Sequence, residues 1–341
     1  MRLHRWLNVF ITVFALAPSL AATAATAPPP SAQAVLEALT KANAAVVGVQ
    51  VTAADGARSA ETLGKQRAGS GVVIGADGLI LTIGYLVMEA QSIQVLTQDN
   101  RSLPAQPVAY DLATGFGLIR ALVPLRGIAP VSLGSHRDLT TGAMVMAAVG
   151  GSDADVAMTQ LVSKRPFSGY WEYHIETALF TSPPIGNHSG APLFNQRGEL
   201  LGIGSLFVSD VMGENRRMAG NMFVPVDLLK PILAEMQQTG SSRQSRRPWI
   251  GLTSSAQDGK VQVMRVSKDS PAQSAGIASG DVVLAVDDIK VTTLEELYRN
   301  IWAHTNPEDE IKLTVLQGAE VKTFRLRGVD RMSTMIKPAG I

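Results

Sequence analysis

Short strand-like segments, separated by tight turns rather than by helices, dominate the chain from residue 46 to residue 208. Runs such as VVGVQVT, GVVIGADGLILT and APLFNQRGELLGIGSLFV are rich in β-branched and aliphatic residues. The corners at 76–78, 99–100 and 196–198 contain Asp, Asn or Gly, which tolerate the positive φ of a tight turn. Because no helix alternates with these strands, we expect a closed antiparallel architecture and not a parallel sheet.

A polar segment, GSSRQSRR at 240–247, divides the chain into two units. It has no apolar periodicity, so we expect a solvated linker and not a binding patch. Before it, PVDLLKPILAEMQQTG has helical spacing and ends at Gly240, a suitable helix stop. After it, residues 248–328 mix strands with two short helical runs, which predicts a smaller α+β domain, and residues 329–341 are expected to form a tail.

The N-terminus is typical of an export signal. A basic segment, MRLHRW, precedes the apolar run LNVFITVFALAPSLAA and the small-residue stretch ATAATA. This pattern predicts a signal peptide over residues 1–24, cleaved after Ala24. An uncleaved membrane anchor is disfavoured, because Pro18 interrupts an apolar run that is short for a span. Residues 25–44 are then a flexible lead-in that includes a short helix over 32–44.

The composition narrows the chemistry and the partners. The chain has no cysteine, which excludes disulfides, cysteine-based zinc sites and thiol catalysis. The formal net charge is +1, so nothing in the charge balance favours nucleic acid or anionic lipid as a partner. No cofactor and no metal site is predicted. The signal and the absence of cysteine together predict a periplasmic protein that is not inserted in the membrane after cleavage.

Four segments carry a resemblance to a known family. They are GSGVVIGADGLILT (69–82), ALFTSPPIGNHSGAPLFNQRGELLGIGS (178–205), MFVPVDLLKPILAEM (222–236), and RPWIGL with SPAQSAGIASGDVVLAVDDIKVTTLEEL at the end of the linker and beyond it. Together they resemble the HtrA family of exported, trypsin-like serine proteases with a C-terminal PDZ domain. The resemblance implies a mainly β fold, with a trypsin-like double antiparallel β-barrel over 45–239 and an α+β PDZ domain over 248–328.

The catalytic residues that this resemblance implies are largely absent. Ser189 in GNHSGAPL occupies the nucleophile position, but LTIGYLV places Tyr85 at the histidine position, and DLATGFGLI places Gly115 at the aspartate position. A serine hydroxyl needs a base, and a phenol with an ordinary pKa of about 10 is not one near neutral pH. The oxyanion pocket would use the N–H groups of Asn187 and Ser189. We therefore predict a pseudoprotease in which Tyr85 and Phe116 fill the vacated cleft.

Hydrolysis by Ser189 with a non-standard base is the alternative. The candidate bases in the mature chain are His136, His174, His188 and His304. None of them shows a carboxylate partner in the sequence. His188 is the immediate neighbour of Ser189 on a tight turn, where adjacent side chains are expected to point apart. A structural or regulatory partner of an active relative is a third possibility.

The second domain keeps a peptide-binding loop. By the same resemblance, Trp249, Ile250, Gly251 and Leu252 form a loop whose backbone N–H groups hold a terminal carboxylate, beside a sheet edge that takes an extended peptide. We therefore predict binding of polypeptides or their C-termini, in envelope protein quality control, with a module used only for packing as the alternative. Relatives form trimers through N-terminal aromatic residues. Residues 25–84 contain no Phe, Trp or Tyr, so a homo-oligomer of that kind is not expected.

Overall fold

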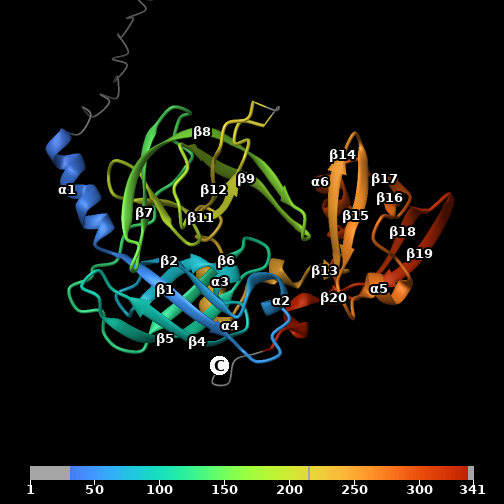
Figure 1. Cartoon of the computed structure of the whole chain (residues 1–341), viewed down its shortest axis with the longest axis horizontal. Coiled ribbons are helices and arrows are strands. Elements are labelled where there is room, and N and C mark those ends of the chain that lie inside the picture. Colours follow the sequence, from blue (N-terminus) through green and yellow to red (C-terminus); the bar gives the residue numbers. More distant parts are fainter. Residues whose placement is uncertain (1–30, 214–215, 337–341) are drawn as a thin grey trace, which may run out of the picture.

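The structure of the protein is a computed structural model that describes residues 31–213 and 216–336. Two β-barrels lie against each other, and a smaller sheet domain lies beside them (Figure 1). The predicted signal peptide and residues 25–30 lie outside the described residues. Among the described residues, every helix is too short or too polar to span a bilayer.

The first barrel closes in the order β1-β2-β3-β6-β5-β4, with antiparallel neighbours. Its predicted corners are confirmed by positive φ at Gly78 (80°) and Asn100 (60°). The strands are β1 (Val46–Ala53), β2 (Gln66–Val73), β3 (Leu79–Ile83), β4 (Ala90–Leu96), β5 (Ser102–Tyr110) and β6 (Phe116–Ala121).

The second barrel closes in the order β10-β11-β12-β9-β8-β7. Its predicted corner at 196–198 is also confirmed, with φ of 72° at Gly198. One buried apolar cluster includes Phe116 of the first barrel together with Phe180 and Phe194 of the second, so the two barrels share a core. The strands are β7 (Met144–Val149), β8 (Asp155–Gly169), β9 (Tyr173–Ser182), β10 (Pro192–Phe194), β11 (Leu200–Val208) and β12 (Gly220–Pro225).

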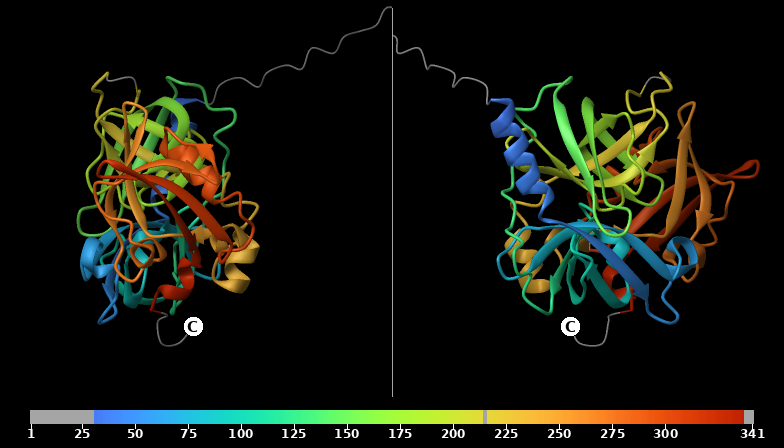
Figure 2. Two further views of the ribbon diagram at one scale, coloured as in Figure 1. Left: turned by 90° about the vertical axis from the view of Figure 1, so that its right-hand side faces the viewer. Right: turned by 60° about the vertical axis from the view of Figure 1, so that its left-hand side comes forward.

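The third body is a separate α+β domain with a core of its own around Leu297, Tyr298 and Ile301. Its sheet runs in the order β14-β15-β16-β18-β19, with β17 added to β16, and β14 lies at one edge. Figure 2 shows this domain on the side of the barrels opposite to α1. The elements are β14 (Leu252–Gln257), β15 (Lys260–Val266), α5 (Pro271–Ala275), β16 (Val282–Val286), β17 (Ile289–Lys290), α6 (Leu294–Ile301), β18 (Glu310–Gln317) and β19 (Glu320–Arg327).

Short elements complete the molecule. The expected first helix is present as α1, and the helix that stops at Gly240 is present as a shorter α4. The remaining elements are α1 (Ala32–Asn43), α2 (Ala60–Leu63), α3 (Gly84–Val87), α4 (Leu233–Thr239), η1 (Arg243–Arg246), β13 (Pro248–Trp249), β20 (Val329–Asp330) and η2 (Arg331–Thr334). Residues 329–336, expected to be a tail, are partly structured. β20 pairs with β13, and the N–H of Ile336 donates to Glu89 on the first barrel.

The prediction of a solvated linker is wrong for part of residues 240–247. Ser242 and Ser245 are buried, and both hydroxyls donate to the fully buried carboxylate of Asp111 in the loop before β6. A buried carboxylate needs hydrogen-bond donors, and the two serines supply them. Arg247 lies over the ring of Trp302 at 3.4 Å, which leaves Arg243 and Arg246 as the exposed cations of this segment.

Candidate functional site

Ser189 lies where the two barrels meet. The N–H of Ser70 on β2 donates to the carbonyl of Ser189 at 2.8 Å, and the N–H of Gly190 donates to Gly204 on β11. Gly190 has φ of 77°, and a Cβ there would lie 2.0 Å from the carbonyl oxygen of Ser70. Only glycine permits this approach, so these two hydrogen bonds and Gly190 position the turn that carries Ser189 between the barrels.

Tyr85 contacts the Ser189 hydroxyl directly. From α3, at the end of β3, its phenol oxygen lies 2.7 Å from Ser189 Oγ and 2.9 Å from the carbonyl oxygen of Ser205. A carbonyl oxygen can only accept, so the single phenolic proton goes to Ser205 and the Ser189 hydroxyl donates to the phenol. Burial raises the pKa of Tyr85 to about 12, against a smaller lowering by the Ser189 hydrogen bond. The group beside Ser189 is therefore a neutral phenol.

Gly115 occupies a turn that offers backbone carbonyls in place of a carboxylate. It has φ of 82°, and its carbonyl accepts from the N–H of Gly84, the residue before Tyr85. The neighbouring carbonyl of Thr114 accepts from the Tyr173 hydroxyl at 2.7 Å. Among the described residues, no carboxylate hydrogen-bonds to Tyr85. Nothing there orients a base or stabilises a cation.

Asn187 and Ser189 are the predicted oxyanion donors. Asn187 adopts a left-handed φ of 47°, and its side-chain amide donates to Asp153 at 3.3 Å. In the part of the chain that the structure describes, the backbone N–H groups of Asn187 and Ser189 donate to no protein acceptor. An oxyanion pocket requires such N–H groups without another acceptor, so their assignment as oxyanion donors stays a prediction.

The histidines have carboxylate partners that the sequence did not reveal. His136 Nδ1 lies 2.6 Å from Asp227, His304 Nε2 lies 2.7 Å from Asp287, and His174 Nε2 lies 3.4 Å from Glu176. The expectation that none of these histidines has a carboxylate partner is therefore wrong. The sequence did not reveal the partners because the fold, or a shared strand surface, brings each pair together. None of these three histidines hydrogen-bonds to Ser189. His188 has its pKa lowered by burial and likewise makes no hydrogen bond to Ser189.

One cluster of potential metal ligands, His174, Glu176 and Glu295, lies on β9 and α6. Arg299 pairs with Glu176 at 2.6 Å and with Glu295 at 2.9 Å. The guanidinium thus already supplies the positive charge between the two carboxylates. The cluster is an ion-pair network between the second barrel and the third domain.

The predicted peptide-binding loop forms a nest of backbone N–H groups, and a carboxylate lies in it. Glu172 Oε1 accepts from Gly251 and Leu252 at 2.7 Å each, and Glu172 Oε2 accepts from Ile250 at 3.1 Å. Gly251 has φ of 89°, and a Cβ there would lie 2.2 Å from Cβ of Ser270, so no other residue fits. Trp249, the fourth predicted residue, lies in β13 under Arg331 and donates nothing to the carboxylate.

Glu172 was missed by the sequence reasoning. It lies at the tip of the β8–β9 hairpin, has φ of 55°, and is 6% exposed. Burial raises the pKa of its carboxyl group, whereas the three N–H donors and the Arg331 guanidinium oppose this. The only local signal was the stretch SGYWEY, in which an acidic residue and three aromatic residues occupy a hairpin tip.

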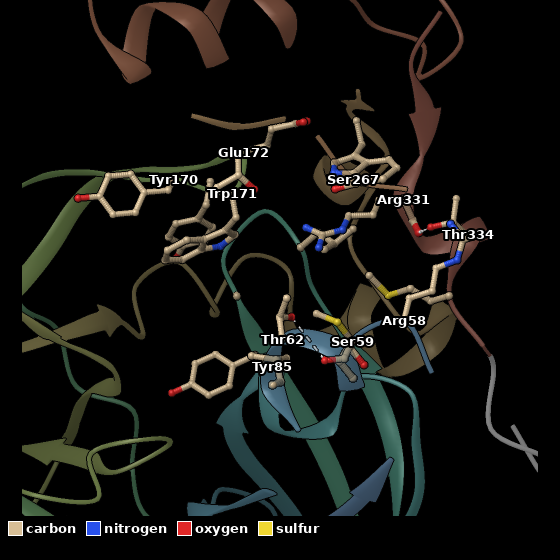
Figure 3. Close-up of a pocket in the computed structure, with 18 of the residues that line it drawn as sticks. Arg58, Ser59, Thr62, Tyr85, Tyr170, Trp171, Glu172, Ser267, Arg331 and Thr334 are labelled. Atoms are coloured by element: carbon tan, nitrogen blue, oxygen red, sulfur yellow. Dashed lines mark hydrogen bonds between the residues drawn. The ribbon is translucent and has the colours of Figure 1, made fainter. Parts of the chain in front are cut away.

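One cavity of about 950 Å³ lies between the barrels and the third domain, next to Tyr85 at one end and Glu172 at the other; Ser189 and the N–H donors Ile250, Gly251 and Leu252 are not among the residues that line it. Tyr85, His188 and Ser205 line it from the barrels, whereas Trp249 and Arg331 line it from the third domain and its end. Figure 3 shows Tyr170, Trp171 and Glu172 of the hairpin tip on the side of this space opposite to Tyr85, with the Glu172 carboxylate pointing away from Tyr85. Phe116 is fully buried in the barrel core and does not line the cavity, so of the two residues expected to fill the cleft only Tyr85 reaches it.

Comparison with known proteins identifies two family models in the chain. Residues 69–203 match a trypsin-like peptidase domain, and residues 248–327 match a PDZ domain. A probable periplasmic, DegP-like serine endoprotease of Halomonas elongata is 31% identical over 270 residues, which are 74% of this chain and 54% of that protein. The serine endoprotease DegS of Haemophilus influenzae is 27% identical over 73% of each chain. The chain spans about half the length of the DegP-like relatives it matches.

Solved structures agree on the fold. The HtrA-type protease AlgW with a tripeptide has a TM-score of 0.54 and 21% identity, and the match covers 91% of this chain and 99% of that one. A serine endoprotease from Yersinia pestis has a TM-score of 0.52 and 23% identity, with 88% and 98% covered. At this identity the likeness concerns the trypsin-like barrels and the PDZ domain as a fold.

Proposed function

Because the chain belongs to the HtrA family of trypsin-fold proteases with a PDZ domain, we propose that it is an exported pseudoprotease that binds polypeptides through its PDZ domain. In this proposal residues 45–239 are the protease-like unit, residues 240–247 the connection, and residues 248–328 the peptide-binding unit. Its place is the periplasm, where it serves envelope protein quality control. The sequence of residues 1–24 and the periplasmic relatives support that location.

The hydrogen bond between Tyr85 and Ser189 is the observation that best supports the proposed loss of catalysis. A phenol with a pKa of about 12 does not accept the serine proton at neutral pH, and Gly115 supplies no carboxylate behind it. Removing the serine or the histidine of a triad costs roughly 10⁶ in turnover, and binding with the oxyanion pocket alone retains about 10³–10⁴ over water. We expect peptide hydrolysis at that residual level at most.

The observation that supports peptide binding is the geometry of the nest. Three successive N–H groups, of Ile250, Gly251 and Leu252, converge on one carboxylate at 2.7–3.1 Å. A terminal carboxylate presents the same two oxygens to the same donors. β14, which follows the nest, is an edge strand and can take an extended peptide.

The experiment on catalysis compares the mature chain with its Ser189→Ala variant on unfolded, fluorescently labelled casein. The two rates should be equal, because Ser189 has no base. A faster wild-type rate, or labelling of native Ser189 by a fluorophosphonate that disappears on denaturation, would contradict the proposal. His188 is the test of the alternative. Its imidazole is kept neutral by burial and lines the same cavity, so an active enzyme should lose its activity in His188→Ala.

The experiments on binding and location are direct. Calorimetry with decapeptides that differ only in their C-terminal residue should show binding of the free acids and none of the C-terminal amides. Lack of binding to every peptide by a folded chain would remove this part of the proposal. Fractionation of cells that express the full sequence should place the shortened, mature chain in the periplasmic fraction.

A further inference from the structure

The β8–β9 hairpin tip, residues Gly169–Glu172, contacts both the nest and the free edge of β14. The N–H of Leu252 donates to Glu172 Oε1, and the N–H of Ser254 donates to the carbonyl of Tyr170 at 2.8 Å. The first bond uses a side chain and the second a main-chain carbonyl, and residues 170–172 form a turn, so the tip covers the edge of β14 without pairing with it as an extended strand. The tip occupies the edge that the proposed function assigns to a polypeptide ligand.

The other wall of this groove also contacts the tip. Tyr298 on α6 donates its hydroxyl proton to the carbonyl of Gly169 at 2.7 Å, and its oxygen accepts from the N–H of Glu172 at 3.2 Å. Tyr298 is fully buried. The tip is thus bonded to β14 on one side and to α6 on the other, and it excludes any second strand from the same groove.

The charge of the tip matches the nest. The Glu172 carboxylate is buried, accepts three backbone hydrogen bonds, and has the Arg331 guanidinium nearby. A buried carboxylate without such donors would cost several kcal/mol, so the nest and Glu172 stabilise each other. A glutamate side chain here presents the carboxylate that a chain end would present, although it comes from the middle of a hairpin.

We propose that residues Gly169–Glu172 are an internal ligand of the PDZ groove, and that a polypeptide C-terminus binds by displacing the Glu172 carboxylate from the nest. This proposal rests on the peptide binding proposed above and adds its regulation. The ligand class is an extended segment with a free carboxylate at the register of Glu172 and a main-chain carbonyl at the register of Tyr170. The affinity observed for such a segment is lowered by the fraction of molecules whose tip is docked.

The test uses the full mature chain and the variant Glu172→Gln, which keeps the shape of the side chain and removes its charge. Glu320→Gln, at the exposed first residue of β19, is the matched control. The probe is segment 163–171 of this chain extended by one C-terminal valine, as the free acid and as the amide. Glu172→Gln should bind the free acid at least tenfold more tightly than the wild type, Glu320→Gln should match the wild type, and the amide should bind neither.

A second measurement needs no peptide. Amide exchange at Gly251 and Leu252 should be at least tenfold faster in Glu172→Gln than in the wild type, because a neutral amide oxygen accepts more weakly than a carboxylate and the amide NH₂ group cannot accept from the nest at all. Tyr298→Phe, which leaves the nest and Glu172 intact, should shift peptide affinity and exchange in the same direction by a smaller factor. Circular dichroism confirms that each variant is folded.

The outcomes separate the two proposals. Equal exchange in the wild type and Glu172→Gln, or equal affinity for the free acid, overturns the internal ligand while leaving peptide binding in place. Faster exchange in Glu172→Gln with no peptide bound by either chain supports the docked tip and overturns the displacement step together with the proposed function.

Discussion

The cleft around Ser189 and the nest around Gly251 both contain backbone N–H groups, but these groups are hydrogen-bonded only in the nest. In the cleft, the N–H groups of Asn187 and Ser189 donate to no acceptor among the described residues, and the Tyr85 phenol oxygen lies 2.7 Å from Ser189 Oγ. In the nest, three amides converge on a carboxylate within 3.1 Å. The loss of catalysis proposed above depends on which side chains are present at the positions of Tyr85 and Gly115. The nest depends on backbone conformation, and one glycine in the left-handed region keeps it.

The difference also concerns the loop before β6. Asp111, at the start of that loop, is retained and fully buried, but it serves the connection between the domains and not a catalytic base. Its oxygens accept from Ser242, Ser245 and Thr114. The carboxylate of Asp111 therefore has a structural role, whereas the carboxylate of Glu172, in the middle of the chain, accepts the three hydrogen bonds of the nest.

The largest effect should come from Gly251→Ala. The added Cβ would meet Ser270 at 2.2 Å and hold alanine at φ of 89°, so we expect a loss of about 3 kcal/mol in unfolding free energy. Peptide affinity, measured in a chain that also carries Glu172→Gln, should fall by at least about 100-fold as the N–H donors move apart. Gly280→Ala is the control. Its φ is 95° but no atom lies within 4 Å of the added Cβ, so only about 1 kcal/mol should be lost, with affinity unchanged. If Gly251→Ala bound the peptide as tightly as the chain without this substitution, the nest would not depend on the left-handed glycine, and the contrast with the cleft would fail.

Asp111→Ala should loosen the segment 240–247 from the first barrel. It leaves the buried hydroxyls of Ser242 and Ser245 without their acceptor, at a cost of about 3 kcal/mol in unfolding free energy. Urea denaturation measures the loss, and trypsin cleavage within residues 240–247 should become faster. Asp153→Ala, which removes an exposed carboxylate that accepts one 3.3 Å bond from Asn187, should stay within about 0.5 kcal/mol of the wild type. Unchanged cleavage in Asp111→Ala would show that the serines do not depend on this carboxylate.

Tyr85→Phe tests the state of the phenol through pH. Burial raises the folded-state pKa of Tyr85 to about 12, above the ordinary value of about 10. The folded state therefore holds the proton more tightly, so the stability from this group is complete below pH 10 and is lost as the pH rises from 10 to 12. Between pH 8 and pH 11 the wild type should lose about 1 kcal/mol more unfolding free energy than Tyr85→Phe. An equal loss in both chains would mean that the phenol ionises normally and could accept a proton from Ser189 more readily.

Ser189→Ala should have the smallest effect. The Tyr85 phenol keeps its bond to the Ser205 carbonyl, and Ser189 is only partly buried, so we expect a change below about 0.5 kcal/mol in unfolding free energy. Ser70→Ala is the matched comparison. Its fully buried hydroxyl accepts from the N–H of Gly150, and its removal should cost about 1.5 kcal/mol. A larger loss in Ser189→Ala than in Ser70→Ala would assign Ser189 a structural role that its contacts do not explain.

Local patterns in the sequence were sufficient for the fold class and for the position of Tyr85, but they placed Phe116 in the cleft, whereas it is buried in the barrel core. Turn residues such as Gly78 and Gly198 determine where strands reverse, because positive φ is a property of the residue itself. Tyr85 and Gly115 could be aligned with the histidine and aspartate positions of the family because their surrounding strands and turns are recognisable, and that assignment remains a prediction. The residues of the nest were identified for the same reason.

Only the tertiary structure decided what those positions contact. Glu172 lies about eighty residues before the nest it fills, Asp111 lies more than 130 residues before the serines that satisfy it, and Asp227 pairs with His136 across 91 positions. No local propensity encodes such contacts, because they depend on how barrels and domains pack and on the need of each buried polar group for a partner. The sequence determined that a carboxylate-binding loop exists, and the packing of the hairpin against it decided which carboxylate it holds.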